Sequence, residues 1–191
     1  MTREQLDHLL RAASEIAGVR DLVVIGSQAV LGTHPDWELP EEATRSVEAD
    51  IAVDLVLAGV GVGVGEGDAT ELADRIDGAI GEGSSFHRMY GYYAQGVEVA
   101  TASLTSGWRE RLVPVIAEAP GGPAVGWCLD INDAWVAKAA AGREKDFAYC
   151  GALAQAGLVD AAVCQERIAL LNAGDRRRGQ AVHKTSFTRG P

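Results

Sequence analysis

Two acidic side chains at alternate positions of an apolar segment are the first candidates for chemistry. Glu48 and Asp50 lie within residues 46–53, whose other members are one serine and five Val, Ile or Ala residues. Because residues two apart on a strand point to the same face, the two carboxylates are expected side by side. A divalent cation relieves their repulsion, and Mg²⁺ is commonly held by one or two carboxylates together with substrate phosphates. The alternative is the solvent-facing side of an ordinary half-exposed strand.

A glycine–serine pair closes the first short apolar run of the chain. The run Leu22–Ile25 stops at Gly26, and residues 27–31 have the pattern of a first helical turn. Glycine lets a phosphate approach the backbone closely, and the N–H groups of a helix start can hold an anion together with the Ser27 hydroxyl. The pair is therefore a candidate phosphate-binding turn. A structural Gly-Ser turn between a strand and a helix is the alternative.

A lysine and a charged run in the last third of the chain form the third candidate. Lys138 lies between alanines in an apolar helix expected over about 132–141, where it could reach a polyphosphate as a point charge. The charged residues Arg143 to Asp146 follow directly after Gly142. The alternative is a surface turn with local ion pairs of small energetic value.

The elements that must position these residues follow from the apolar periodicity. Helical spacing predicts a first helix over 2–17 with a capping box at Thr2 and Gln5, and short apolar runs predict strands. The expected later elements are strands at 22–25, 47–57, 92–104, 112–116 and 125–129, a helix at 69–80, and helices at 132–141, 144–156 and 160–171. This order predicts an α+β (mixed α/β) fold, with a mixed sheet flanked by helices and a helical C-terminal layer over about 131–172.

Length and charge bound the organisation of the chain. The 191 residues are expected to form one domain over 1–174, followed by a flexible basic tail over 175–191. A net charge of −10 argues against sequence-blind binding to nucleic acid or to an anionic membrane. No apolar run approaches the ~20 residues that span a bilayer, and no signal sequence is present, so a cytoplasmic protein without a membrane partner is expected.

Other residues that could carry chemistry show weaker patterns. The three cysteines, Cys128, Cys150 and Cys164, lack the spacing of a disulfide framework or a zinc site. The alternating glycines of residues 59–67 are not a dinucleotide fingerprint and predict a flexible loop near the acidic segment. Aromatic residues that could stack on a base, with packing in the core as the alternative, are Trp37, Tyr90, Tyr92, Tyr93 and Trp108.

Taken together, the pieces resemble a known family. Gly26-Ser27, then Ser46-x-Glu48-x-Asp50, then Lys138 and Asp146 resemble the signature of polymerase-β-type nucleotidyltransferases, most closely the minimal AbiEii/MenT-like group on the toxin side of bacterial toxin–antitoxin pairs. The resemblance covers roughly residues 20–170. It implies an enzyme in which Glu48, Asp50, Lys138 and Asp146 are catalytic, and in which Glu48 and Asp50 bind Mg²⁺. It also implies a nucleotide held by Gly26, Ser27, Arg45, Lys138 and Arg143, with Asp146 supporting the site or the lysine.

The implied reaction is nucleotidyl transfer from an NTP to an acceptor hydroxyl with release of pyrophosphate. The implied acceptor is tRNA, and the implied protein partner is a cognate antitoxin. Two alternatives stay open: a weak or inactive nucleotide- or partner-binding member of the same fold, and an aminoglycoside-type enzyme whose cationic acceptor suits the acidic surface. The chain departs from the family pattern in having Glu48 where an aspartate is usual and in the 21 positions from Ser27 to Glu48. The candidate for a third carboxylate is Glu98, with a solvent-facing strand residue as the alternative.

Overall fold

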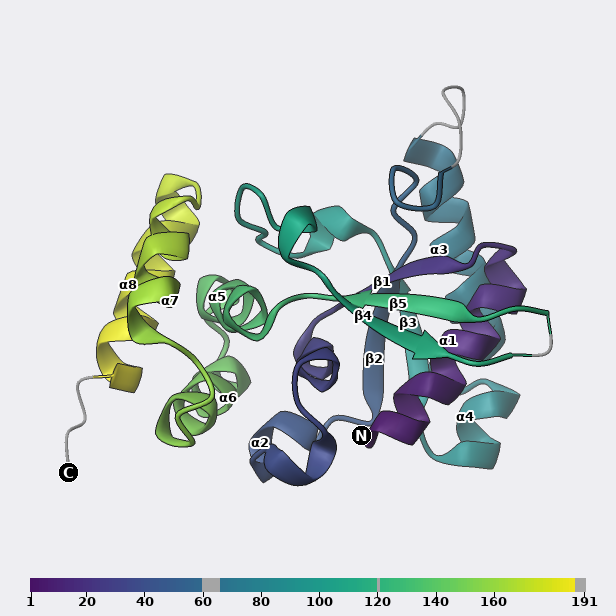
Figure 1. Cartoon of the computed structure of the whole chain (residues 1–191), viewed down its shortest axis with the longest axis horizontal. Helices are drawn as coiled ribbons and strands as arrows, with labels where there is room; N and C mark the ends of the chain where they lie inside the picture. The colour runs from purple at the N-terminus through teal and green to yellow at the C-terminus, as the bar shows by residue number, and fades with distance from the viewer. Residues whose placement is uncertain (60–65, 120, 188–191) are drawn as a thin grey trace.

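A mixed five-stranded sheet forms the centre of the molecule in the computed structural model, which describes residues 1–59, 66–119 and 121–187 (Figure 1). The strands are β1 (Asp21–Ile25), β2 (Glu48–Ala52), β3 (Tyr93–Val97), β4 (Val113–Ala117) and β5 (Ala124–Cys128). Their order is β3-β2-β1-β5-β4, in which β1–β5 and β2–β3 are parallel and β1–β2 and β4–β5 are antiparallel. This arrangement confirms the predicted α+β class with a mixed sheet.

Helices flank the sheet. The α-helices are α1 (Arg3–Ala17), α2 (Glu41–Thr44), α3 (Glu66–Ile80), α4 (Ser85–Tyr90), α5 (Ile131–Ala141), α6 (Glu144–Gln155), α7 (Ala161–Ala169) and α8 (Ala173–Phe187). The 3₁₀ turns are η1 (Ser27–Gly32), η2 (Asp36–Glu38), η3 (Val99–Thr101) and η4 (Arg109–Arg111). Figure 1 shows α1, α3 and α4 grouped on one side and α5 to α8 gathered on the other, with η1 and α2 between that group and the sheet.

The first helix shows how the sequence pattern becomes packing. Thr2 and Gln5 form the predicted capping box, and the apolar face of α1 is fully buried at Leu6, Leu9 and Leu10. The helix approaches the sheet closely, because a Cβ atom at Gly126 would lie 2.5 Å from Leu10 Cδ1. The α1 and α3 face of the sheet is thereby closed, and the opposite face is left for η1, α5 and the polar residues of β2.

The structure differs from the sequence-based expectations at several elements. Residues 175–191 were expected to be a flexible tail, whereas α8 reaches Phe187 and packs with Val182 buried in the core. Two of the expected strands are shorter, since β2 ends at Ala52 and β3 at Val97. Short helices α2 and α4 lie in segments for which no helix was predicted.

Two further expectations concern segments rather than elements. Residues 60–65 of the glycine tract lie outside the described residues, so the predicted loop there stays a prediction. Within the part of the chain that the structure describes, no helix is both long and apolar enough to cross a membrane.

Candidate functional site

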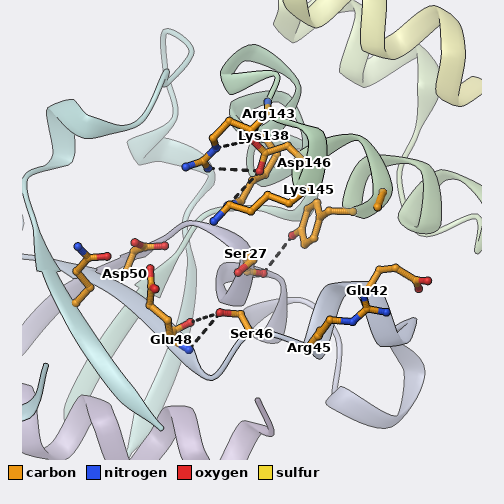
Figure 2. A pocket seen from close by; sticks show the side chains of 13 residues that line it. Ser27, Glu42, Arg45, Ser46, Glu48, Asp50, Lys138, Arg143, Lys145 and Asp146 are labelled. Atoms are coloured by element: carbon orange, nitrogen blue, oxygen red, sulfur yellow. Dashed lines mark hydrogen bonds and ion pairs between the residues drawn. The ribbon is translucent and has the colours of Figure 1, made fainter. Parts of the chain in front are cut away.

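An open cavity of about 510 Å³ lies between the polar face of β2, η1, α2 and the junction of α5 and α6 (Figure 2). It is lined by Ser27, Glu42, Arg45, Ser46, Glu48, Asp50, Gln95, Lys138, Arg143, Lys145, Asp146, Ala148 and Tyr149. The lining brings together residues from segments about 100 positions apart in the chain. Of the residues to which the resemblance gives a catalytic, metal-binding or nucleotide-binding role, all except Gly26 line this cavity.

The two carboxylates of β2 share the face that is turned toward the cavity. Ala49 and Ile51, which alternate with them, are fully buried on the other face, as the strand period requires. The pKa of Asp50 is raised to about 6 because the carboxyl is largely buried and because Glu48 lies beside it, with Lys138 and Arg143 acting in the opposite direction. The positive charges of Lys138 and Arg143 therefore do not fully offset the effects of burial and of Glu48 on the pKa of Asp50.

Gly26 has a role that its sequence position did not indicate. Its backbone has φ 72° and ψ −157°, a combination that is essentially restricted to glycine. A Cβ atom there would lie only 1.8 Å from Asp50 Oδ2. The glycine therefore leaves the space that the Asp50 carboxylate occupies, and it is not among the described residues that line the cavity.

Tyr93 of β3 holds the Glu48 carboxylate. Its hydroxyl donates a hydrogen bond to Glu48 Oε2 at 2.8 Å, and the ring is almost completely buried. Burial and the adjacent Glu48 together raise the pKa of Tyr93 well above its ordinary value, so the hydroxyl remains a donor at physiological pH. The sequence indicated Tyr93 only as a candidate for stacking, because the pairing of β3 with β2 cannot be read from the sequence.

A cationic group faces the carboxylates across the cavity. Asp146, whose side chain is almost fully buried, lies 3.7 Å from Lys138 Nζ and 2.8 Å from Arg143 Nε. The hydrogen bond to Asp146 raises the pKa of Arg143 further, so its charge is permanent. Gly142, with φ 62°, ends α5 and turns the chain into α6, and Asp146 accepts the Arg143 backbone N–H at 3.2 Å. Asp146 thereby contacts both cations at the cavity, and its supporting role in the site stays a prediction.

Ser27 and its neighbours form the floor between the two charged groups. The Tyr149 hydroxyl donates to the Ser27 carbonyl oxygen at 3.1 Å, which ties η1 to α6. Gln28 is fully buried and donates to the Ala43 carbonyl oxygen at 3.1 Å, which ties η1 to α2. The position of Ser27 is thus set by contacts from both sides, and its side chain faces the cavity.

Two further cations lie at the cavity wall. Arg45 is largely exposed and forms an ion pair with Glu41 at 3.4 Å, so it lies at the rim. Lys145 is exposed and extends toward the carboxylate side of the cavity in Figure 2. In the sequence, Lys145 was only one member of the charged run after Gly142, and the structure adds it to the lining of the cavity.

The candidate third carboxylate is not part of this arrangement. Glu98 lies after the end of β3, where it accepts a hydrogen bond from the Thr70 hydroxyl at 2.9 Å and is not among the described residues that line the cavity. In the described part of the chain, no group of three or more His, Cys, Asp or Glu residues could hold a metal ion. The three cysteines are buried and free.

The donor set at the cavity nevertheless fits a hard divalent cation. Glu48 and Asp50 offer carboxylate oxygens from one face of one strand, and burial and the adjacent Glu48 raise the pKa of Asp50 even though Lys138 and Arg143 act to lower it. A Mg²⁺ ion bound by one or two carboxylates and completed by water and phosphate oxygens requires no more protein ligands than these.

Comparison with known protein families identifies a family to which the chain belongs. The model of a family described as "nucleotidyltransferase of unknown function (DUF6036)" matches residues 4–183. No curated protein and no solved structure matches the chain. The family match covers the whole sheet, the cavity and most of the C-terminal helices, so the chain belongs to this family of nucleotidyltransferases, DUF6036.

Proposed function

We propose that this chain is a Mg²⁺-dependent enzyme that transfers a nucleotide from an NTP to an acceptor hydroxyl. The observation that carries the proposal is the cavity in which Glu48 and Asp50 face Lys138, Arg143 and Lys145 across Ser27. One side of this cavity suits a divalent cation and the other suits a polyphosphate. Family membership supports the general reaction class.

The residues of the chain have distinct tasks in this proposal. Arg143 and Lys145 neutralise charge on the triphosphate, Lys138 adds a point charge held in place by Asp146, and the Ser27 hydroxyl donates to a phosphate oxygen. Mg²⁺, held by Glu48 and Asp50, would supply charge neutralisation at the reacting phosphate. The acceptor hydroxyl loses its proton to solvent, its oxygen forms a bond to the α-phosphorus, the bond from that phosphorus to the bridging oxygen breaks, and pyrophosphate leaves. Catalysis of this kind is mainly positioning and electrostatic stabilisation.

The resemblance to AbiEii/MenT-like proteins extends the proposal to the acceptor. On this basis we infer that the chain is the toxin of a toxin–antitoxin pair, that it modifies tRNA, and that a cognate antitoxin binds it. The test of this part is growth arrest on expression, relieved by the product of an adjacent gene. Growth unaffected by the active chain would contradict the toxin assignment and leave the transferase reaction to be judged by its own experiment.

The transferase reaction is tested by incubating the protein with each labelled NTP, Mg²⁺ and total tRNA. We expect transfer of label to RNA by the natural chain and loss of transfer in Asp50→Asn. The matched control is Asp74→Asn, which removes the same charge from an exposed position of α3 and should retain transfer. Transfer that persists in Asp50→Asn would contradict the proposal.

The alternatives predict different outcomes of the same assay. A small-molecule enzyme would leave tRNA unlabelled and label a cationic aminoglycoside. A binding-only member of the family would label neither acceptor. Such a protein would bind an NTP in a calorimetric titration, with an affinity that depends on neither Mg²⁺ nor Glu48.

A further inference from the structure

The neighbouring strand β3 places two side chains beside the two acids of β2. The strands are parallel, and the register pairs Glu48 with Tyr93 and Asp50 with Gln95. The hydrogen bond from Tyr93 to Glu48 shows that paired residues at this point lie on the same face of the sheet. Gln95 lies two positions after Tyr93, so the strand period puts it on that face too, next to Asp50.

The following residue of β3 fixes the direction of Gln95 independently. Gly96 faces α3, because a Cβ atom there would lie only 1.9 Å from the Ala73 carbonyl oxygen. Since successive side chains of a strand point to opposite faces, Gln95 must point away from α3 and toward the cavity. It is exposed and lines the cavity.

We propose that Gln95 supplies a neutral amide oxygen as the third protein ligand of the cation site, so that the site holds a single divalent cation. The proposal rests on the proposed function, since it concerns the same Mg²⁺ site. Amide carbonyl oxygens are ordinary ligands of hard cations, and Glu48, Asp50 and Gln95 would contribute a total charge of −2.

The charge count explains why one ion is the expected occupancy. Two divalent ions a few ångströms apart repel each other, and two-metal centres hold them with bridging carboxylates and further anionic ligands. Here the third position of the cluster is neutral. The other acids that line the cavity are Glu42 and Asp146, and Asp146 is paired with Lys138 and Arg143. Among the described residues, no group of three His, Cys, Asp or Glu residues could hold a metal ion. Lys138 and Arg143 lie close enough to affect the charge of Asp50, and they oppose a second cation further.

The test is a calorimetric titration of the full chain with Mn²⁺ in the absence of nucleotide, read as the number of ions bound and their dissociation constants. We expect one ion in the natural chain and a dissociation constant about tenfold higher in Gln95→Ala, as one neutral oxygen ligand is lost. Gln95→Glu, which keeps the side-chain length and adds a carboxylate, should bind the first ion more tightly and admit a second.

Gln155→Ala and Gln155→Glu are the matched controls. Gln155 is an exposed glutamine of α6 that does not line this cavity, and its variants change composition and net charge equally. Both should bind Mn²⁺ as the natural chain does. Circular dichroism of each variant confirms that it is folded.

The outcomes separate this inference from the proposed function. Two ions in the natural chain, or an unchanged dissociation constant in Gln95→Ala, would overturn the role of Gln95. If Gln95→Ala has no effect but the natural chain binds one ion and Asp50→Asn binds none, the cation site of the proposed function is upheld without Gln95. If Mn²⁺ does not bind, or binds equally to the natural chain and to Asp50→Asn, both proposals are overturned.

Discussion

At the scale of single residues, Asp50 is a side chain whose charge opposes folding. Its pKa is about 6 in the folded chain, against an ordinary value of 3.8, because of burial and the adjacent Glu48. The folded state therefore holds the proton more tightly than the unfolded state. The resulting loss of stability begins as the pH rises above 3.8 and is complete above pH 6. This position of the Asp50 carboxylate is expected for a group that binds a cation and is not expected for a group selected only for stability.

The first prediction follows from the loss of stability that ionised Asp50 causes as the pH rises. Asp50→Asn should be more stable than the natural chain at pH 8 without divalent cations, by about 1–3 kcal/mol, and the difference should shrink toward pH 4. Thermal unfolding of both proteins at the two pH values measures it. Added Mg²⁺ should stabilise the natural chain only, because ligand binding to the folded state raises its stability. A natural chain more stable than Asp50→Asn at pH 8 without metal would refute the assignment.

Tyr93 gives the second prediction at this scale. Tyr93→Phe keeps the buried ring and removes the hydrogen bond that orients Glu48. Partners of this kind change metal affinity by about tenfold or more, so the Mg²⁺ concentration for half-maximal activity should rise by about tenfold, with a smaller change in kcat at saturating Mg²⁺. Mn²⁺ calorimetry supplies the readout independent of activity.

The neighbouring tyrosine supplies the control for Tyr93→Phe. The Tyr92 hydroxyl also forms a 2.8 Å hydrogen bond, but to His8 Nδ1 of α1. Tyr92→Phe therefore removes a contact of equal length without touching Glu48, and it should leave the Mg²⁺ dependence unchanged. If the two substitutions changed the Mg²⁺ dependence equally, Tyr93 would have a structural role only and would not orient a metal ligand.

At the scale of elements, the sequence predicted those whose apolar pattern is strong and missed those held by tertiary contacts. The apolar stripe of α1 and the short apolar runs of β1 and β5 were read correctly. Residues 175–191 contain few apolar side chains and a run of arginines, so they indicated a loose tail. In the fold, Phe187 packs on Trp135 with ring centroids 5.4 Å apart, and Arg178 donates to the Ala140 carbonyl oxygen at 2.5 Å.

The candidate site shows the same division. Glu48, Asp50 and Lys138 could be found because charged residue types are unusual within apolar segments, and Asp146 was indicated by the family resemblance. Tyr93 and Gln95 could not, because their role depends on the register between β2 and β3. Strand pairing over 45 positions is a tertiary property that a local pattern does not encode.

The third prediction tests whether α8 is part of the fold. Val182 is 2% exposed and belongs to the hydrophobic core, so Val182→Ala should lower the free energy of unfolding by about 1–3 kcal/mol. The control is Gln180→Ala on an exposed position of the same helix, which should change stability by less than about 0.5 kcal/mol. Chemical denaturation of both variants measures the difference. An unchanged free energy of unfolding in Val182→Ala would contradict the packing of α8 and support a flexible tail.

At the scale of the whole molecule, the net charge of −10 conceals a local excess of cations on one wall of the cavity. Of these, Arg143 and Lys138 share Asp146, and Arg45 pairs with Glu41, whereas Lys145 is exposed and extends into the cavity. A bound triphosphate should therefore respond to Lys145 more than to the overall charge. The electrostatic field that attracts a triphosphate to this acidic protein therefore comes from the cations of the cavity and not from the net charge.

The fourth prediction separates local from overall charge with two substitutions that change the net charge equally. Lys145→Glu should weaken binding of Mg²⁺–ATP by tenfold or more, since reversing one charge a few ångströms from a phosphate costs more than about 1.4 kcal/mol in a partly buried cavity. Arg11→Glu makes the same change on α1, on the other side of the sheet, and should weaken binding less than about twofold at physiological ionic strength. Calorimetry at two salt concentrations measures both. Equal weakening by the two variants would mean that the net charge of the molecule, and not the cationic wall, governs nucleotide affinity.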